Sequence, residues 1–309
     1  MHRRTTDADI YFVRNTRAKA AEATFSFRVE GRAPEIWIPD DGSTTPALVY
    51  KETKDARTEI PLSFPPSGSV FLIFQRPAAR HVIAIRRDGK EVFPSINQGA
   101  GLFSDDGSTF VASTPGTYRV IDSNGGDRTF VVKPADMESR IDMQWTLSFP
   151  SGWGAPASIP VKQFQSWTES EDPGVRYFSG TATYSGTLHI PAELLKQQLW
   201  LDLGQVREIA SVKVNGVAVQ TVWREPYLTR IDGQLHPGEN TVEIQVTNLW
   251  PNRIIGDLQP SATVHYTQTN VRAYTKDSPL LPSGLIGPVT IKTIHAIRIQ
   301  PLLDAAERR

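Results

Sequence analysis

The sequence contains no cysteine among its 309 residues. Disulfides and thiolate metal sites are therefore excluded, and the composition fits either the cytoplasm or a Gram-negative periplasm. The chain also has no excess of either charge, because lysine plus arginine and aspartate plus glutamate each number 33. Without net charge or a long basic run, neither nucleic acid nor an anionic membrane is expected as a partner.

Long hydrophobic runs are absent too. No segment approaches the ~20 apolar residues that a membrane-spanning helix needs, so no membrane partner is expected. The first residues, Met-His-Arg-Arg-Thr-Thr-Asp, lead into a predicted strand and not into a cleavable apolar segment. No signal peptide is therefore predicted from this sequence.

The remaining composition is that of an ordinary soluble globular protein, with 39% hydrophobic and 21% charged residues. A chain of 309 residues exceeds what one hydrophobic core usually organises, so two domains are expected. The polar segment Lys133-Pro-Ala-Asp-Met-Glu-Ser139 separates two series of predicted strands. We therefore predict domains at residues 1–138 and 139–309.

Short runs with alternating side-chain character predict an all-β fold. Residues 9–14 and 24–29 alternate with a period of two, which is typical of half-buried strands. Asp88-Gly89 and Asn215-Gly216 predict two-residue hairpins. The other predicted strands are 35–38, 47–51, 58–64, 70–75, 82–87, 109–113, 117–122, 128–133, 141–149, 176–189, 198–203, 209–214, 217–222, 241–247 and 288–300. With one helical turn expected at 190–197, the pattern predicts two β-sandwich domains in tandem.

Several segments resemble known carbohydrate enzymes. In the second half these are 166–184, Val212-Lys-Val-Asn-Gly216, Val246-Thr-Asn-Leu-Trp-Pro-Asn-Arg-Ile-Ile-Gly-Asp257 and Ser283-Gly-Leu-Ile-Gly-Pro-Val289. Together they resemble the galactose-binding-like sandwich of family 2 glycoside hydrolases, and more closely the C-terminal sandwich of family 106 α-L-rhamnosidases. In the first half, residues 2–15, 32–40 and 68–74 resemble the first sandwich of family 106.

The resemblance implies a carbohydrate context and a galactose-binding-like jelly roll for the second domain. The resemblance does not extend to the catalytic barrel, which bears the acid and base carboxylates in family 106. The predicted function is therefore a non-catalytic carbohydrate-binding or accessory region, with carbohydrate and a separate catalytic barrel domain as partners. Relatives of this family are often exported, so a periplasmic or extracellular location is expected if the chain is part of an exported enzyme; the sequence itself leaves the location open.

One segment combines the residue types that bind sugars. Trp250 offers an aromatic face, and Asn248, Asn252, Arg253 and Asp257 offer amides, a guanidinium and a carboxylate for hydroxyl groups. These five residues are the predicted sugar-binding site. The alternative is that Trp250 caps the sandwich core and Arg253 forms a local ion pair with Asp257.

The other aromatic residues fall into two groups. Trp145 and Trp200 lie in alternating strands and are predicted to be buried, as is Tyr227 with its hydroxyl bonded. Trp37, Trp153 and Trp167 lie near proline or glycine turns and are candidates for exposed platforms.

Glycosidic cleavage ordinarily needs two carboxyl groups flanking the bond. The densest acidic segment, Glu169-Ser-Glu-Asp172, is predicted to be a solvated turn, and no catalytic acid or base is assigned. A second hypothesis keeps the chain as a self-sufficient hydrolase or lyase with its site between the sandwiches, where Arg176 and Tyr177 serve elimination from a uronic acid. A third hypothesis, a purely structural interaction module, predicts no sugar affinity.

No cofactor or metal is predicted, although the resemblance leaves a structural Ca²⁺ open. Asp122-Ser-Asn-Gly-Gly-Asp127 lacks the ligand spacing of a calcium loop, so a glycine-rich hairpin is expected there. The six histidines are scattered without the pairing of a zinc site.

Overall fold

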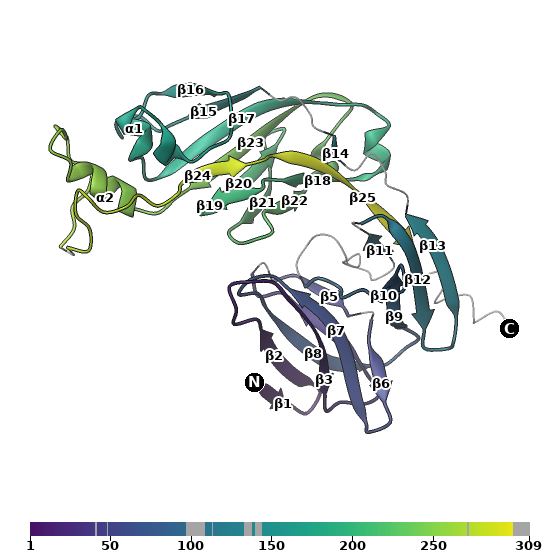
Figure 1. Cartoon of the computed structure of the whole chain (residues 1–309). Helices are drawn as coiled ribbons and strands as arrows, with labels where there is room; N and C mark the ends of the chain where they lie inside the picture. Colours follow the sequence, from purple (N-terminus) through teal and green to yellow (C-terminus); the bar gives the residue numbers. More distant parts are fainter. Residues whose placement is uncertain are drawn as a thin grey trace. The chain divides into compact units, whose positions relative to one another are not determined.

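The computed structural model describes residues 1–40, 42–47, 49–96, 109–112, 114–132, 138–139, 144–270 and 272–298. Antiparallel strands dominate it, joined by a few short helices (Figure 1), which confirms the predicted all-β class. The chain divides into unit 1, with Met1–Met137 and Ile294–Arg309, and unit 2, with Glu138–Thr293. The residues from Ile294 onward, expected in the second domain, are thus grouped with unit 1.

The first core of unit 1 lies between two sheets. The five-stranded sheet has the order β1 (His2–Arg4), β2 (Asp9–Arg14), β8 (Ser69–Pro77), β4 (Arg32–Trp37) and β5 (Thr44–Pro46). The three-stranded sheet has the order β3 (Ala21–Phe27), β7 (Arg57–Phe64) and β6 (Lys51–Thr53). Ile60, Leu62 and Phe64 of β7 share one buried cluster with Leu72 and Phe74 of β8, because alternate residues of a strand face the same side.

Unit 1 also contains a second, smaller core. Its four-stranded sheet has the order β10 (Lys90–Glu91), β9 (Val82–Arg87), β12 (Gly116–Asp122) and β13 (Asp127–Val132). Ile85 of β9 packs with Tyr118 and Val120 of β12 and with Phe110 of β11 (Thr109–Ala112). The strands from residue 82 onward therefore bury their apolar faces in a cluster of their own that also includes Val49, whereas the sequence predicted one sandwich for this half.

Unit 2 is built on a six-stranded sheet. Its order is β16 (Ser158–Val161), β15 (Trp145–Ser148), β17 (Thr181–Ile190), β23 (Gly238–Thr247), β20 (Ile209–Val214) and β21 (Val217–Val222). The remaining strands are β14 (Glu138–Ser139), β18 (Gln198–Asp202), β19 (Gln205–Arg207), β22 (Leu228–Arg230), β24 (Gly284–Gly287) and β25 (Thr290–Arg298). Ala182, Tyr184 and Leu188 of β17 share a core with Leu199 and Leu201 of β18. Only the first residues of β25 belong to unit 2; its residues 295–298 are part of unit 1, where they pair with β11.

The helical elements are all short. They are η1 (Trp167–Glu169), α1 (Pro173–Arg176), η2 (Leu194–Lys196), η3 (Asp232–Gln234) and α2 (Pro251–Asp257). α1 replaces the start of the strand predicted at 176–189, because Asp172 caps it with a 2.7 Å bond from the Gly174 amide and Pro173 suits its first turn. Within the described residues, no helix combines the length and apolar character needed to cross a membrane.

Both predicted hairpin turns are confirmed. Asp88 and Gly89 have φ of 48° and 81°, and Asn215 and Gly216 have φ of 51° and 77°, as a type I′ turn requires. The strand predicted at 47–51 is wrong, because the described residues Ala47, Val49 and Tyr50 are buried but lie between β5 and β6 and outside both strands. There, the amide of Ala47 donates to the Pro34 carbonyl, but no regular strand ladder continues through the segment.

Candidate functional site

The predicted sugar-binding segment folds mainly as helix α2. Pro251 stands in the first turn, where its missing N–H leaves no helical bond unmade. Gly256 faces Tyr177, and a Cβ at position 256 would lie only 2.5 Å from the Tyr177 Cβ. This close approach requires glycine and holds the helix against the chain that follows α1.

The two predicted amides are buried, and the oxygen and nitrogen of each bond to the backbone. Asn248 accepts from the Gly180 amide at 2.9 Å and donates to the Phe178 carbonyl at 2.8 Å. Asn252 donates to the Leu281 carbonyl at 2.7 Å and accepts from the Leu281 amide at 2.8 Å. These side chains fasten the first part of the site segment to the sandwich.

Arg253 and Asp257 form the ion pair that the alternative interpretation predicted. Their Nε and Oδ1 atoms lie 3.0 Å apart, with side chains only 6% exposed. The guanidinium lies 4.8 Å from the centre of the Tyr266 ring. The other Asp257 oxygen accepts from the Tyr266 amide at 2.9 Å and from the Thr267 amide and hydroxyl at 2.7 Å. The pair thereby anchors the chain that returns from α2.

Trp250 differs from these four residues because it is 53% exposed. It does not cap the core, so this part of the alternative interpretation is wrong. Its ring meets the half-buried Trp153 edge to face at 6.0 Å, and Trp153 stacks on Tyr266 at 6.3 Å. We call these three residues the aromatic platform.

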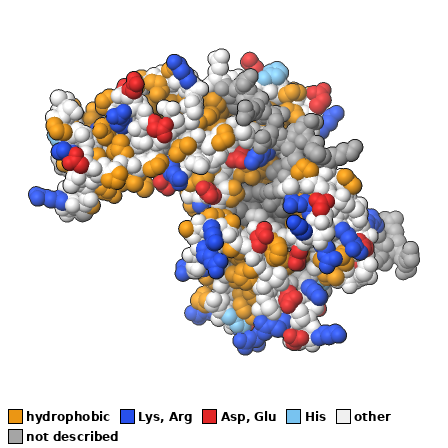
Figure 2. Space-filling view, viewed as in Figure 1, with side chains coloured by type: hydrophobic (Ala, Val, Ile, Leu, Met, Phe, Trp, Pro, Cys, Tyr) orange, Lys and Arg blue, Asp and Glu red, His pale blue; other side chains and the backbone are white. Residues whose placement is uncertain are grey.

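Exposed aliphatic side chains accompany the platform. Leu249, Leu258, Val264 and Leu281 are each at least 40% exposed and belong to α2 or its flanking chain. In the space-filling view, hydrophobic side chains gather over the part of unit 2 that contains α2 (Figure 2). This end of unit 2 therefore presents apolar surface to its surroundings.

The remaining aromatic predictions are mostly confirmed. Trp145 and Trp200 are buried, and the buried Tyr227 donates from its hydroxyl to the Glu208 carbonyl at 3.2 Å. Trp37 is 43% exposed, in agreement with its assignment as a candidate platform. Its indole donates to a neighbouring carboxylate in the same strand.

Trp167 is not an exposed platform, because it is only 3% exposed. Its indole donates to the Tyr184 hydroxyl at 2.7 Å, and the Leu285 amide donates to the same oxygen at 3.2 Å. Burial raises the pKa of Tyr184 to about 12. These two aromatic residues line a pocket of about 330 Å³, together with Phe164 and exposed amides from Gln163 and Gln165. Its described lining contains no Asp or Glu, so it offers no acid–base pair.

The acidic turn is held by local bonds. Asp172 caps α1, and Arg176 donates from Nε to the Ser170 carbonyl at 2.8 Å. The Tyr177 ring faces Arg253, whose guanidinium carbon lies 6.0 Å from the ring centre. These contacts give no support to the elimination chemistry of the second hypothesis.

The carboxylates of the glycine-rich loop at 122–127 are also held by local contacts. Asp122 accepts from Arg80 at 2.6 Å and from the amides of Asn124 and Gly126. Asp127 pairs with Arg119. Among the residues that the structure covers, no group of three or more His, Asp or Glu side chains could hold a metal ion.

Comparison with known proteins shows that the chain is similar to parts of larger glycoside hydrolases. The α-L-rhamnosidase model of glycoside hydrolase family 106 matches residues 1–52. A solved rhamnosidase structure from Novosphingobium sp. PP1Y is 34% identical, with a TM-score of 0.70, and the match covers 95% of this chain and 23% of that one. A curated putative β-glucuronidase from Formosa agariphila is 33% identical over 216 residues, which make up 62% of this chain and 19% of that protein.

These matches confirm the resemblance to family 106 α-L-rhamnosidases. The rhamnosidase match spans nearly the whole chain and the glucuronidase match 62% of it, but each covers only about a fifth of the relative's own length. The shared region with the rhamnosidase includes both sandwich-bearing units described above.

Proposed function

We propose that this chain is a non-catalytic carbohydrate-binding region of an α-L-rhamnosidase-like glycoside hydrolase, and that the aromatic platform is its contact with sugar. The observation that supports the proposal is the exposed indole of Trp250, fixed by a buried scaffold. Sugars place C–H faces on aromatic rings, while nearby polar groups set their orientation. A ring that is already held in place loses little entropy on binding.

The scaffold refines the predicted site. Asn248 and Asn252 bond to the backbone of unit 2, and Arg253 is paired with the buried Asp257, so these residues position Trp250 and leave the sugar contact to the platform. Trp153 adds a second ring edge beside it. We therefore expect a shallow site with modest affinity, suited to a sugar chain more than to an enclosed monosaccharide.

The test is a calorimetric titration of the chain with L-rhamnose, galactose, uronic acids and pectic oligosaccharides. Trp250→Ala should weaken binding about tenfold, which corresponds to ~1.4 kcal/mol. Trp223→Ala is the matched control, because Trp223 is 45% exposed elsewhere in unit 2. Equal binding by both variants and the parent would remove the platform from the proposal. Turnover of an aryl rhamnoside by the purified chain would contradict a non-catalytic role.

A docking role for the same surface is the second candidate. Leu249, Leu258, Val264 and Leu281 are aliphatic, and side chains of this type suit a protein contact better than a sugar face. The occupant would be a catalytic barrel domain of family 106, since the relatives are far longer than this chain. Leu249→Ser with Leu258→Ser should then abolish binding to a separately produced barrel domain while leaving sugar titrations unchanged.

A further inference from the structure

A polar pocket of about 390 Å³ lies in unit 1, and none of the predicted sugar-binding residues lines it. Three segments form it: the β1–β2 hairpin, the chain from Arg28 to Arg32, and the turn at Ala56. Its volume lies within the ~300–1,000 Å³ range of ligand sites. Its charged lining comprises three arginines, Arg4, Arg28 and Arg32, against Asp9 and Glu30.

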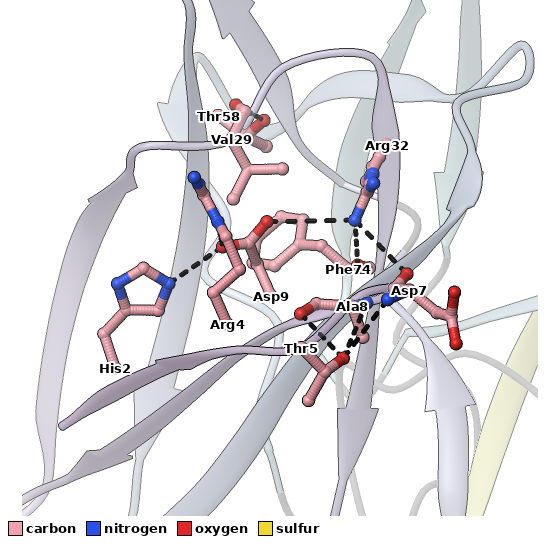
Figure 3. Close-up of polar contacts among 10 residues, drawn as sticks. All are labelled: His2, Arg4, Thr5, Asp7, Ala8, Asp9, Val29, Arg32, Thr58 and Phe74. Atoms are coloured by element: carbon pink, nitrogen blue, oxygen red, sulfur yellow. Dashed lines mark hydrogen bonds and ion pairs between the residues drawn. The ribbon is translucent and has the colours of Figure 1, made fainter.

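Asp9 organises the wall of this pocket (Figure 3). It is 5% exposed. Its Oδ1 atom accepts hydrogen bonds from the His2 ring at 2.9 Å and from Arg4 Nε at 2.8 Å. Arg32 approaches the other oxygen from the opposite side at 3.8 Å and also donates to the carbonyls of Asp7 and Phe74. Burial opposes the charge of Asp9, but the bonds from Arg4 and His2 hold its pKa below the usual value.

The hairpin that presents Arg4 is itself fixed. The Thr5 hydroxyl accepts from the Ala8 amide at 3.0 Å and donates to the Ala8 carbonyl at 3.2 Å. The ring of His2 stacks on Tyr11 at 4.1 Å with an interplanar angle of 2°. The pocket wall is therefore preorganised, which lowers the entropy lost when a ligand binds.

The arginines have more donors than Asp9 can accept. Only Nε of Arg4 is bonded to Asp9, and the side chain is 66% exposed. In the described part of unit 1, the Arg28 side chain has no hydrogen-bond or ion-pair partner, although it lines the same pocket. Planar guanidinium groups bind carboxylate, sulfate and phosphate oxygens through paired N–H bonds.

We propose that this pocket binds the carboxylate or sulfate group of an acidic saccharide, with Arg28 as the principal unpaired donor and Arg4 beside it. Asp9 acts as a positioning residue that holds Arg4 and Arg32 at the wall. The choice of a saccharide rests on the carbohydrate context of the proposed function. The anion site itself does not depend on sugar binding at Trp250.

The experiment titrates the full chain with four probes: a uronic-acid oligosaccharide, a sulfated oligosaccharide, a neutral oligosaccharide of the same length, and inorganic sulfate. At least one acidic oligosaccharide should bind more tightly than the neutral one, and the arm that binds identifies the anion. Arg28→Ala should weaken that binding about tenfold. Glu30→Gln should strengthen it, because Glu30 repels the anion from the same lining.

Arg14→Ala is the matched control, since Arg14 is an exposed arginine of β2 outside the pocket lining. Equal loss in Arg14→Ala and Arg28→Ala would mean nonspecific charge attraction and overturn the proposal. Unchanged binding in Arg28→Ala would overturn it as well, as would inorganic sulfate binding as tightly as the oligosaccharides. Because Trp250→Ala tests the platform separately, either proposal can fail while the other stands.

Discussion

An arginine–aspartate pair occurs in both units, but its surroundings give it opposite properties. In unit 2, Arg253 and Asp257 are each 5% exposed, and the carboxylate is surrounded by donors from one returning loop. In unit 1, Asp9 is equally buried, but its arginine partners are exposed and outnumber it. The first arrangement anchors a loop inside unit 2, whereas the second leaves guanidinium donors facing solvent.

The difference shows what separates a scaffold from a binding site. Residue type does not decide it, since both clusters use the same guanidinium and carboxylate groups. Whether such a cluster is a scaffold or a binding site depends on how many donors exceed the acceptors, and on whether those extra donors are exposed. This comparison predicts a graded series of mutational effects.

The largest effect is expected from Asp257→Ala. The substitution leaves the buried Arg253 charge unpaired and removes the acceptor of three bonds from Tyr266 and Thr267. Breaking a buried pair in this way should lower the free energy of unfolding of unit 2 by ~3–5 kcal/mol. Urea unfolding followed by tryptophan fluorescence suits this test, because every tryptophan except Trp37 lies in unit 2.

The control for this prediction is Asp277→Ala. Asp277 pairs with Lys276, but its side chain is 76% exposed, and exposed pairs contribute at most about 1 kcal/mol. An Asp257→Ala variant that unfolds at the same urea concentration as Asp277→Ala would show that the buried pair is not part of the scaffold.

A smaller and pH-dependent effect is expected from Asp9→Asn. The folded pKa of Asp9 lies below its ordinary value of 3.8. Its charge therefore stabilises unit 1 above that value, and the contribution disappears as pH falls through the folded pKa. The difference in melting temperature between parent and Asp9→Asn should be largest near neutral pH and shrink below about pH 4.

Asp7→Asn provides the matched control for the acid titration. Asp7 lies in the same hairpin, but it is exposed and contributes its backbone, not its carboxylate, to the polar contacts. Calorimetric scans between neutral and acidic pH should show no such convergence for this variant. Convergence in both would attribute the effect to the net charge of the hairpin.

Much of the fold could be predicted from sequence because strands and turns depend on local signals. β2, β9, β20 and β21 have the predicted bounds, and Asn215-Gly216 forms the expected turn. Helix α2 was missed because Pro251 signals a turn and the first position of a helix equally well. Its packing against Tyr177 is a long-range contact that no local pattern encodes.

The candidate sites were harder to predict for the same reason. The segment around Trp250 contains the right residue types, but burial of Asn248 and Asn252 depends on carbonyls from Phe178 and Leu281, both distant in sequence. The Asp9 pocket gave no local signal either, since its arginines come from β1, from the chain after β3 and from the start of β4. Sheet register brings these segments together only in the folded chain.

The smallest effect on stability is expected from Arg28→Ala, and this makes it the sharpest test of the comparison. Arg28 is exposed and has no side-chain partner in the described part of unit 1, so its removal should change the free energy of unfolding by no more than about 0.5 kcal/mol. Arg253→Ala should instead destabilise unit 2, because it leaves Asp257 buried without its cation. Denaturant unfolding of both variants gives the answer, and a destabilised Arg28→Ala protein would mean that unit 1, too, uses its arginines to hold the fold.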